Sequence, residues 1–154
     1  MSGPLTQVLL AHFDSVFEGP NGDYSAVLEA LTDLSVAQAL WKPAPDQNSI
    51  WQIVEHLIAS KQWQIEMLEQ GQAAQPVWTD PSGDETDWQA TQVRLKDAHH
   101  RLRMALEQVP EDELLKIPVP EWKKTLLELI LSSGAAHEAH HSGQIDYLKG
   151  LQTS

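Results

Sequence analysis

The segment "AAHEAHHSGQIDYLKG", residues 135–150, collects three of the chain's seven histidines inside a helical pattern. An α-helix turns about 100° per residue, so His141 lies roughly 40° from His137. By the same arithmetic, one stripe of this helix is apolar at both ends and polar in the middle: Leu126, Ile130, Ser133, His137, His141, Gln144 and Leu148. A solvated face would be polar throughout, and a core stripe apolar throughout. The pattern therefore predicts a small polar site inside an apolar seam.

Capping signals define the helix around this segment. Thr125 and Glu128 fit a capping box, which predicts a helix from Leu126 to about Lys149. Gly150 is the expected stop. Within this helix, Gly143 lowers helix stability by about 1 kcal/mol relative to alanine. Its presence therefore predicts a close helix or backbone approach, beside the site or at a subunit contact.

Helical periodicity extends to the rest of the chain, where no segment has convincing strand alternation. Three further long helices are predicted: residues 4–17, 49–70 and 82–108. Ser49 and Gln52 fit a capping box for the second, with Asn48 as an alternative cap, and Gly71 ends it. Ser82 and Glu85 fit a capping box for the third.

The intervening segments are less regular. A shorter helical piece over residues 24–32 leaves open whether the first helix is interrupted. Pro43 and Pro45 predict an extended connection before Ser49, and residues 110–122 break the helical pattern. The predicted fold class is therefore all-α, a four-helix bundle forming a single domain over residues 1–154.

Composition excludes several classes of function. The net charge is −12, with 22 acidic against 10 basic residues and no basic stripe, which argues against nucleic-acid binding. There is no apolar run near the length of a membrane span, which predicts no membrane partner. Cysteine is absent, which excludes disulfides and thiolate ligands and makes the cytoplasm the expected location.

A third candidate ligand, His56, lies in "SIWQIVEHLIASKQW", residues 49–63, at the edge of an apolar stripe. A lone histidine there could instead have a structural packing role. With His137 and His141 it would give three imidazoles, which suit zinc, nickel, iron or copper with open positions for water or substrate. Trp51 and Trp63 flank His56 as candidate pocket walls, unless they are ordinary core residues. The tryptophans near loops or helix starts are expected to cover the bundle ends: Trp41, Trp78, Trp88 and Trp122.

The remaining histidines are weaker candidates. His99 and His100 are neighbours and diverge on a helix, and their charged surroundings predict a solvated or half-buried face. His12 falls on the apolar side of the first helix, where packing is the expected role and a contribution to the pocket is the alternative. His140 lies roughly 60° off the polar stripe.

Two segments resemble the DinB-like (DinB/YfiT-type) four-helix-bundle family. They are "ALTDLSVAQALWKPAPDQNSIWQIVEHLIASKQW", residues 30–63, and "AAHEAHHSGQIDYLK", residues 135–149. The resemblance implies a bundle with a non-sequential helix arrangement, often a homodimer, and a divalent transition metal held by three histidines. Carried over by motif, these are His56, His137 and His141. His140 stands where relatives often have a tyrosine or another residue, so it could compete as a ligand.

The resemblance also implies a range of functions. Some relatives are transferases or isomerases that use a low-molecular-weight thiol, so the leading prediction is a metal-dependent thiol S-transferase acting on small electrophiles. A metal-dependent hydrolase ranks second, because no general base is clearly placed: Glu55 and Glu138 adjoin candidate ligands but point about 100° away. A non-catalytic metal-binding or stress-response bundle protein, or a dimerising bundle without metal, would also fit the sequence.

Overall fold

The computed structural model describes residues 2–153, and within that range the regular structure is entirely helical. The elements in chain order are α1 (Pro4–Phe17), α2 (Val27–Ala30), α3 (Val36–Leu40), α4 (Ile50–Gln70), α5 (Glu85–Glu107), α6 (Glu111–Leu114), the 3₁₀ turn η1 (Pro120–Trp122), α7 (Leu126–Ile130), the π-helical turn η2 (Leu131–Ala136) and α8 (His137–Thr153). The predicted all-α fold class is confirmed.

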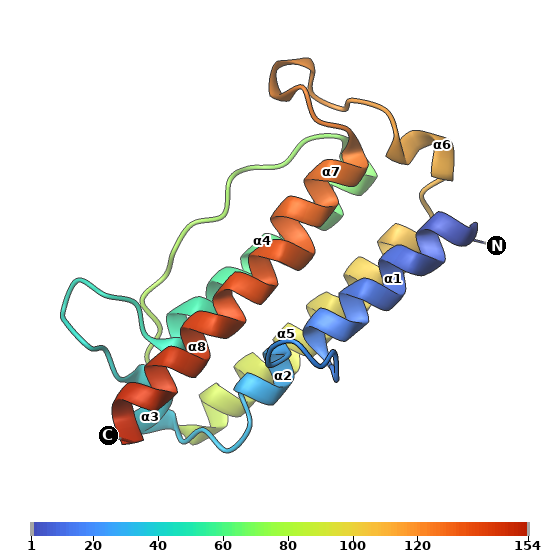
Figure 1. The fold of residues 1–154 in the computed structure, drawn as a ribbon. Coiled ribbons are helices and arrows are strands. Elements are labelled where there is room, and N and C mark those ends of the chain that lie inside the picture. Colours follow the sequence, from blue (N-terminus) through green and yellow to red (C-terminus); the bar gives the residue numbers. More distant parts are fainter. Residues whose placement is uncertain (1, 154) are drawn as a thin grey trace.

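Four long rods form a bundle, with α7, η2 and α8 joined end to end as the fourth (Figure 1). Helix α4 packs against α5 and α8, while α1 packs against α5, η2 and α8. Helices α4 and α5 run parallel to each other, and α1 and α8 run the opposite way (Figure 1). The connection between α4 and α5, residues 71–84, therefore returns along the whole bundle, which brings loop side chains beside α4 and α8.

The core consists of two apolar clusters, one toward each end of the bundle. The first surrounds Trp51 and Trp88, and the second surrounds Phe13 and Leu102. Between them, α4, α5 and α8 contribute buried polar side chains: Lys61, His99, Glu138 and His141. Burial of these two apolar clusters provides hydrophobic stabilisation on either side of the polar layer.

Local capping chemistry confirms two of the three predicted capping boxes. The Ser49 hydroxyl accepts from the Gln52 N–H at 3.1 Å, and the Thr125 hydroxyl accepts from the Glu128 N–H at 3.2 Å. The box predicted at Ser82 is wrong. Asp84 caps α5 instead, since its carboxylate accepts from two backbone N–H groups of the first turn, at 2.9 and 3.1 Å.

Two segments predicted as connections contain short helices. Within residues 34–48, Ser35 caps α3, and its hydroxyl accepts from the Gln38 N–H at 3.2 Å. Within residues 110–122 lie α6 and η1. All three are too short to show a helical period, but the S-x-x-Q spacing at Ser35 is the same signal that marks α4.

The last helix does not stop at Gly150 but continues to Thr153. Contacts with α2 and α3 hold its final turns: Lys149 Nζ donates to the Ala30 carbonyl at 2.8 Å, and Gln152 Nε2 donates to the Gln38 carbonyl at 3.2 Å. Tertiary contacts thus override the local stop signal.

The close approach expected at Gly143 beside the site is found instead at Gly134, and the alternative expected at Gly143, a subunit contact, stays a prediction. A Cβ at Gly143 would have no neighbour within 4 Å, whereas one at Gly134 would lie 2.5 Å from both Gln64 Oε1 and Phe13 Cζ. Gly134 belongs to the π-helical turn η2, directly before His137. Such turns are common at functional sites. Among the described residues, no helix has the length and apolarity to cross a membrane.

Candidate metal centre

Three histidines from two helices converge on one point. His56 lies on α4, and His137 and His141 lie one turn apart on α8. The Nε2 atom of His137 is 3.1 Å from that of His56 and 2.9 Å from that of His141. One ligand nitrogen from each of the three lies within 4.8 Å of the others. The structure therefore brings together the three residues selected from the sequence.

The nitrogen geometry fits a metal ion. A single N–H on His137 could serve only one of its two Nε2 contacts, and unprotonated nitrogens at these distances repel one another. A cation among the three nitrogens removes this conflict. Nitrogens bound tetrahedrally to one zinc ion at about 2.0–2.1 Å would lie about 3.3 Å apart, close to the separations that His137 makes.

Hydrogen bonding directs the His141 lone pair toward the cluster. His141 Nδ1–H donates to Gln144 Oε1 at 2.6 Å, which leaves Nε2 as the acceptor or ligand atom. The Nδ1 atoms of His56 and His137 are buried without a hydrogen-bond partner. Gln144 thus orients one of the three imidazoles, and the other two rely on packing.

Burial keeps the three imidazoles neutral. Burial and then the neighbouring His141 lower the pKa of His56 from 6.5 to about 4. Burial, followed by His141 and His56, lowers the pKa of His137 to about 4. Burial also lowers the pKa of His141, against the opposing effect of its hydrogen bond to Gln144. Neutral imidazoles are the form that binds metals, so the cluster is ready for a cation at neutral pH.

The loop after α4 supplies a side chain that sequence reasoning missed. The Trp78 ring stacks on the His56 imidazole with centroids 3.9 Å apart and 5° between the planes. It also meets His141 edge-on at 5.9 Å. The prediction that Trp78 covers an end of the bundle is wrong. Residues 71–84 return along the bundle and instead place Trp78 against His56 and His141. No local sequence pattern encodes these contacts.

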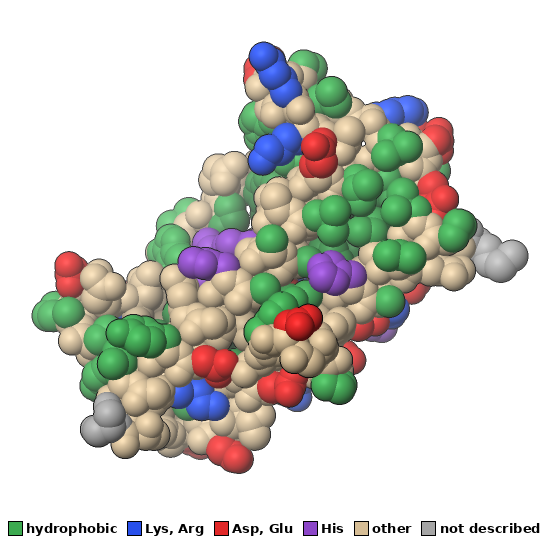
Figure 2. All heavy atoms as spheres, in the orientation of Figure 1, with side chains coloured by type: hydrophobic (Ala, Val, Ile, Leu, Met, Phe, Trp, Pro, Cys, Tyr) green, Lys and Arg blue, Asp and Glu red, His purple; other side chains and the backbone are tan. Residues whose placement is uncertain are grey.

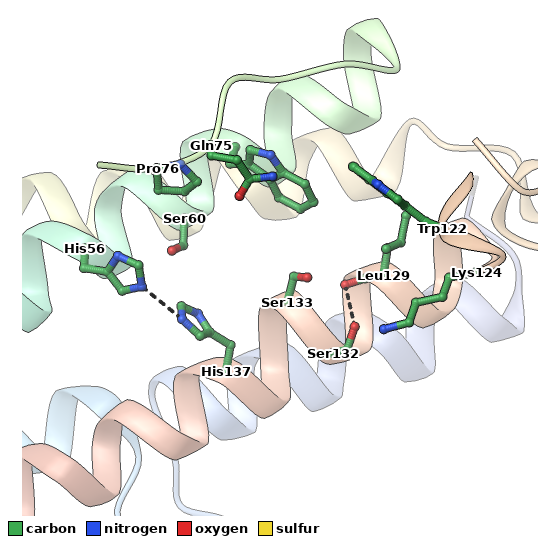
Figure 3. A pocket seen from close by; sticks show the side chains of 11 residues that line it. His56, Ser60, Gln75, Pro76, Trp122, Lys124, Leu129, Ser132, Ser133 and His137 are labelled. Atoms are coloured by element: carbon green, nitrogen blue, oxygen red, sulfur yellow. Dashed lines mark hydrogen bonds between the residues drawn. The ribbon is translucent and has the colours of Figure 1, made fainter. Parts of the chain in front are cut away.

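A pocket of about 560 Å³ opens beside the histidines (Figure 3). Its lining comes from α4, the loop after it and the α7–η2–α8 rod: His56, Ser60, Trp63, Gln75, Pro76, Trp122, Lys124, Leu129, Ser132, Ser133 and His137. No carboxylate is among these residues. Figure 2 shows histidines reaching the surface on this face, and cationic side chains where the segment before α7 protrudes.

The other residues proposed for the site lie in different places. Trp63 lines the pocket, whereas Trp51 is 2% exposed in the core, where its Nε1–H donates to Thr91 Oγ1 at 3.1 Å. His140 is exposed and stands outside the three-histidine group.

The prediction of a solvated or half-buried face is wrong for His99, which is 2% exposed. Lys61 Nζ donates to its Nδ1 at 3.1 Å, and its Nε2–H donates to Asp14 at 3.0 Å. Lys61 is also buried and pairs with Glu138, and Phe17 stacks on the His99 ring. Burial, followed by the charges of Lys61 and Arg103, lowers the pKa of His99 to about 2.

The two remaining histidines are exposed. His100 is consistent with the predicted solvated face, but the packing role predicted for His12 is wrong. His12 is exposed although Leu9, Phe13 and Val16 of the same helix are buried.

Comparison with known proteins gives one match. The family model of the DinB superfamily matches residues 22–145, which include all three converging histidines. Neither the curated proteins nor the solved structures give a significant match.

Proposed function

The chain belongs to the DinB superfamily, and on this premise we propose that it is a metal-dependent enzyme, most specifically a thiol S-transferase. The observation that carries the proposal is the convergence of His56, His137 and His141 at the edge of an open pocket. Three protein ligands beside a pocket are typical of catalytic metal sites, whereas structural sites are closed by a fourth protein ligand. No fourth His, Cys, Asp or Glu joins this group among residues 2–153.

The donor atoms limit which metals the site would bind. Three neutral imidazoles suit zinc, nickel, iron or copper and disfavour magnesium and calcium, which prefer oxygen ligands. When bound, such a metal supplies Lewis acidity, which lowers the pKa of a coordinated thiol or water. The protein supplies the neutral imidazoles, the Trp78 ring that shields one of them, and the pocket that admits the substrate.

The pocket lining favours thiol transfer over hydrolysis. A metal-dependent hydrolase commonly uses a carboxylate as general base, and this lining has none. A low-molecular-weight thiol needs no such base once it is deprotonated. Its sulfur forms the new bond to an electrophilic carbon, the leaving group departs with the electrons of the broken bond, and the thiol proton passes to solvent.

Two further predictions accompany this function. The family resemblance predicts a homodimer, and the absence of cysteine predicts residence in the cytoplasm. Size-exclusion chromatography with light scattering would test the first, and localisation of a tagged copy in cells the second. A monomer, or a copy outside the cytoplasm, would contradict them.

The first experiment measures metal content by mass spectrometry on untagged protein purified without chelators. About one equivalent is expected in the wild type and in His140→Ala, an exposed histidine of the same helix. His56→Ala and His137→Ala should lose the metal. Absence of metal from all four, with none acquired after incubation with zinc, nickel, iron or copper, would refute the metal site.

The second experiment tests the reaction. Glutathione or cysteine is offered together with 1-chloro-2,4-dinitrobenzene, and release of chloride with formation of the thioether is followed by absorbance. Acceleration that requires the metal and is lost in His137→Ala would support S-transfer. Metal-dependent hydrolysis of an ester without any effect of thiol would favour the hydrolase. Bound metal without either activity would favour a non-catalytic metal-binding protein.

A further inference from the structure

The pocket extends away from the three histidines along the seam between α4 and α8. His56 and His137 lie at one end, and Trp122, Leu129 and Lys124 lie at the other, with Ser60 and Ser133 between them (Figure 3). Leu129 precedes His137 by eight residues, which at about 1.5 Å per residue gives a length of about 12 Å. The space is long enough for a molecule with several functional groups.

The far end of the pocket has an aromatic wall. The rings of Trp63 and Trp122 have centroids 6.2 Å apart and planes 32° apart. Trp63 is 9% exposed and Trp122 is 40% exposed, so the first forms the floor and the second remains accessible. Leu129 lies beside them in the lining. Indole faces and an aliphatic side chain together favour a flat, apolar group.

Two hydroxyls occupy the middle of the pocket. Ser60 lies one turn after His56 on α4, and Ser133 lies one turn before His137. Both hydroxyls point toward the space between the rods (Figure 3), and neither makes a hydrogen bond within residues 2–153. By contrast, the hydroxyl of Ser132 donates to the Glu128 carbonyl at 2.7 Å. Ser60 and Ser133 are therefore available to a polar group of a ligand.

The charge of the lining is opposite to that of the chain. The protein has a net charge of −12, yet Lys124 provides the only formal charge among the pocket residues. Lys124 makes no hydrogen bond or ion pair within the described part of the chain. The Lys124 charge attracts the Glu128 carboxylate only at longer range, and the N–H of Thr125 donates to that carboxylate at 2.7 Å. The Lys124 ammonium can therefore pair with an anion in the pocket and would repel a cationic ligand.

We propose that this pocket binds a small organic anion with a flat apolar body. Its anionic group pairs with Lys124, its body lies against Trp63 and Trp122, and its remaining end reaches the histidines past Ser60 and Ser133. The assignment rests on the proposed function, because it names the substrate class of the same site. Binding of the anion itself requires only the pocket, so the two proposals can fail separately.

The test uses metal-free, full-length protein and a matched pair of fluorescent probes. One probe is 8-anilinonaphthalene-1-sulfonate, and the other is N-phenyl-1-naphthylamine, which has the same rings without the sulfonate. We expect Lys124→Gln to raise the Kd of the sulfonate about five-fold at low salt and to leave the Kd of the uncharged probe unchanged. Trp122→Ala should raise the Kd of both probes about ten-fold.

Lys123→Gln is the control, because it removes the same charge from a neighbouring residue outside the lining. Equal weakening by Lys123→Gln and Lys124→Gln would show a general charge effect and overturn the assignment. Unchanged binding in Trp122→Ala would show that the probes bind elsewhere and would also overturn the assignment.

Metal content is measured on the same variants. Anion binding with no metal uptake would refute the proposed function alone, and metal uptake without selective anion binding would refute this inference alone.

Discussion

Trp78 covers one face of His56, with ring centroids 3.9 Å apart and the planes 5° from parallel. His56 Nδ1 is buried and has no hydrogen-bond partner, so no carboxylate or carbonyl fixes the orientation of this imidazole. Stacking takes over the role that a hydrogen bond to the second ring nitrogen usually performs in metal sites. A tryptophan from a loop thus orients a candidate metal ligand from a helix.

Replacing Trp78 by alanine should therefore weaken metal binding. Loss of an orienting partner typically costs ten- to a hundred-fold in affinity, and we expect about ten-fold here because the imidazole itself remains. The measurement is a competition titration against a chromophoric chelator. Trp41→Ala is the matched control, a partly exposed tryptophan in another connection, and it should retain wild-type affinity. Equal affinities for all three proteins would show that the stacking does not orient His56.

His56 and His137 should bind metal with almost no release of protons at pH 6.0. With pKa values of about 4, His56 and His137 are already neutral at that pH in the folded protein. Ligands with the ordinary pKa of 6.5 would each release about 0.8 proton. Calorimetric titration in two buffers of different ionisation enthalpy measures the number released. A value near two protons would mean that burial does not hold these histidines neutral.

The same lowered pKa values make the metal-free protein less stable in acid. Between about pH 6.5 and pH 4 the unfolded chain binds more protons than the folded protein at His56 and His137, so stability rises with pH in that window. The contribution is fully present above pH 6.5 and is lost as the pH falls through 4. Urea denaturation from pH 7 to pH 4 should show a steeper decline for wild type than for His56→Gln. Parallel declines would exclude this linkage.

How far the sequence predicts the site depends on the range of the interactions. Helical periodicity places His137 and His141 on one stripe, because both belong to one helix, and the capping boxes at Ser49 and Thr125 are local signals that the structure confirms. The stacking of Trp78 is different. It depends on the path of a long loop across the bundle, and no spacing within the loop reports that path.

His99 shows the same limit inside a helix. Charged neighbours in the sequence indicate a solvated face, yet the partners that satisfy this histidine, Lys61 and Asp14, come from α4 and α1. A polar residue that is buried with complementary partners has the same sequence pattern as one that is solvated. Only the assembly of the helices distinguishes them.

The buried pair of Lys61 and Glu138 provides a stability test of this polar layer. Both side chains are at most 2% exposed, so removing one charge leaves the other buried and unpaired. Lys61→Met should lower the free energy of unfolding by about 3–5 kcal/mol. The double variant Lys61→Met/Glu138→Gln should lose less than the sum of the two single variants, since no isolated charge remains.

Urea denaturation measures this cycle, with Arg94→Met as the control. Arg94 pairs with Glu55 but its side chain is 53% exposed, and loss of such a pair costs about 1 kcal/mol or less. Additive effects of the two buried substitutions would show that Lys61 and Glu138 do not stabilise each other. In that case the layer would be held by the surrounding apolar packing.

The two glycines of the last rod should respond oppositely to alanine. A Cβ at Gly134 would lie 2.5 Å from Phe13 Cζ and from Gln64 Oε1, and both of those side chains are buried. Gly134→Ala should therefore lower the free energy of unfolding by about 1–3 kcal/mol through overpacking. At Gly143 nothing lies within 4 Å, so Gly143→Ala should raise it by up to about 1 kcal/mol through helix propensity. Urea denaturation of both variants measures the difference.

Because η2 leads directly into His137, metal affinity should also fall in Gly134→Ala and stay unchanged in Gly143→Ala. Destabilisation by Gly143→Ala would instead point to a neighbour at that face in solution, as expected for a subunit contact.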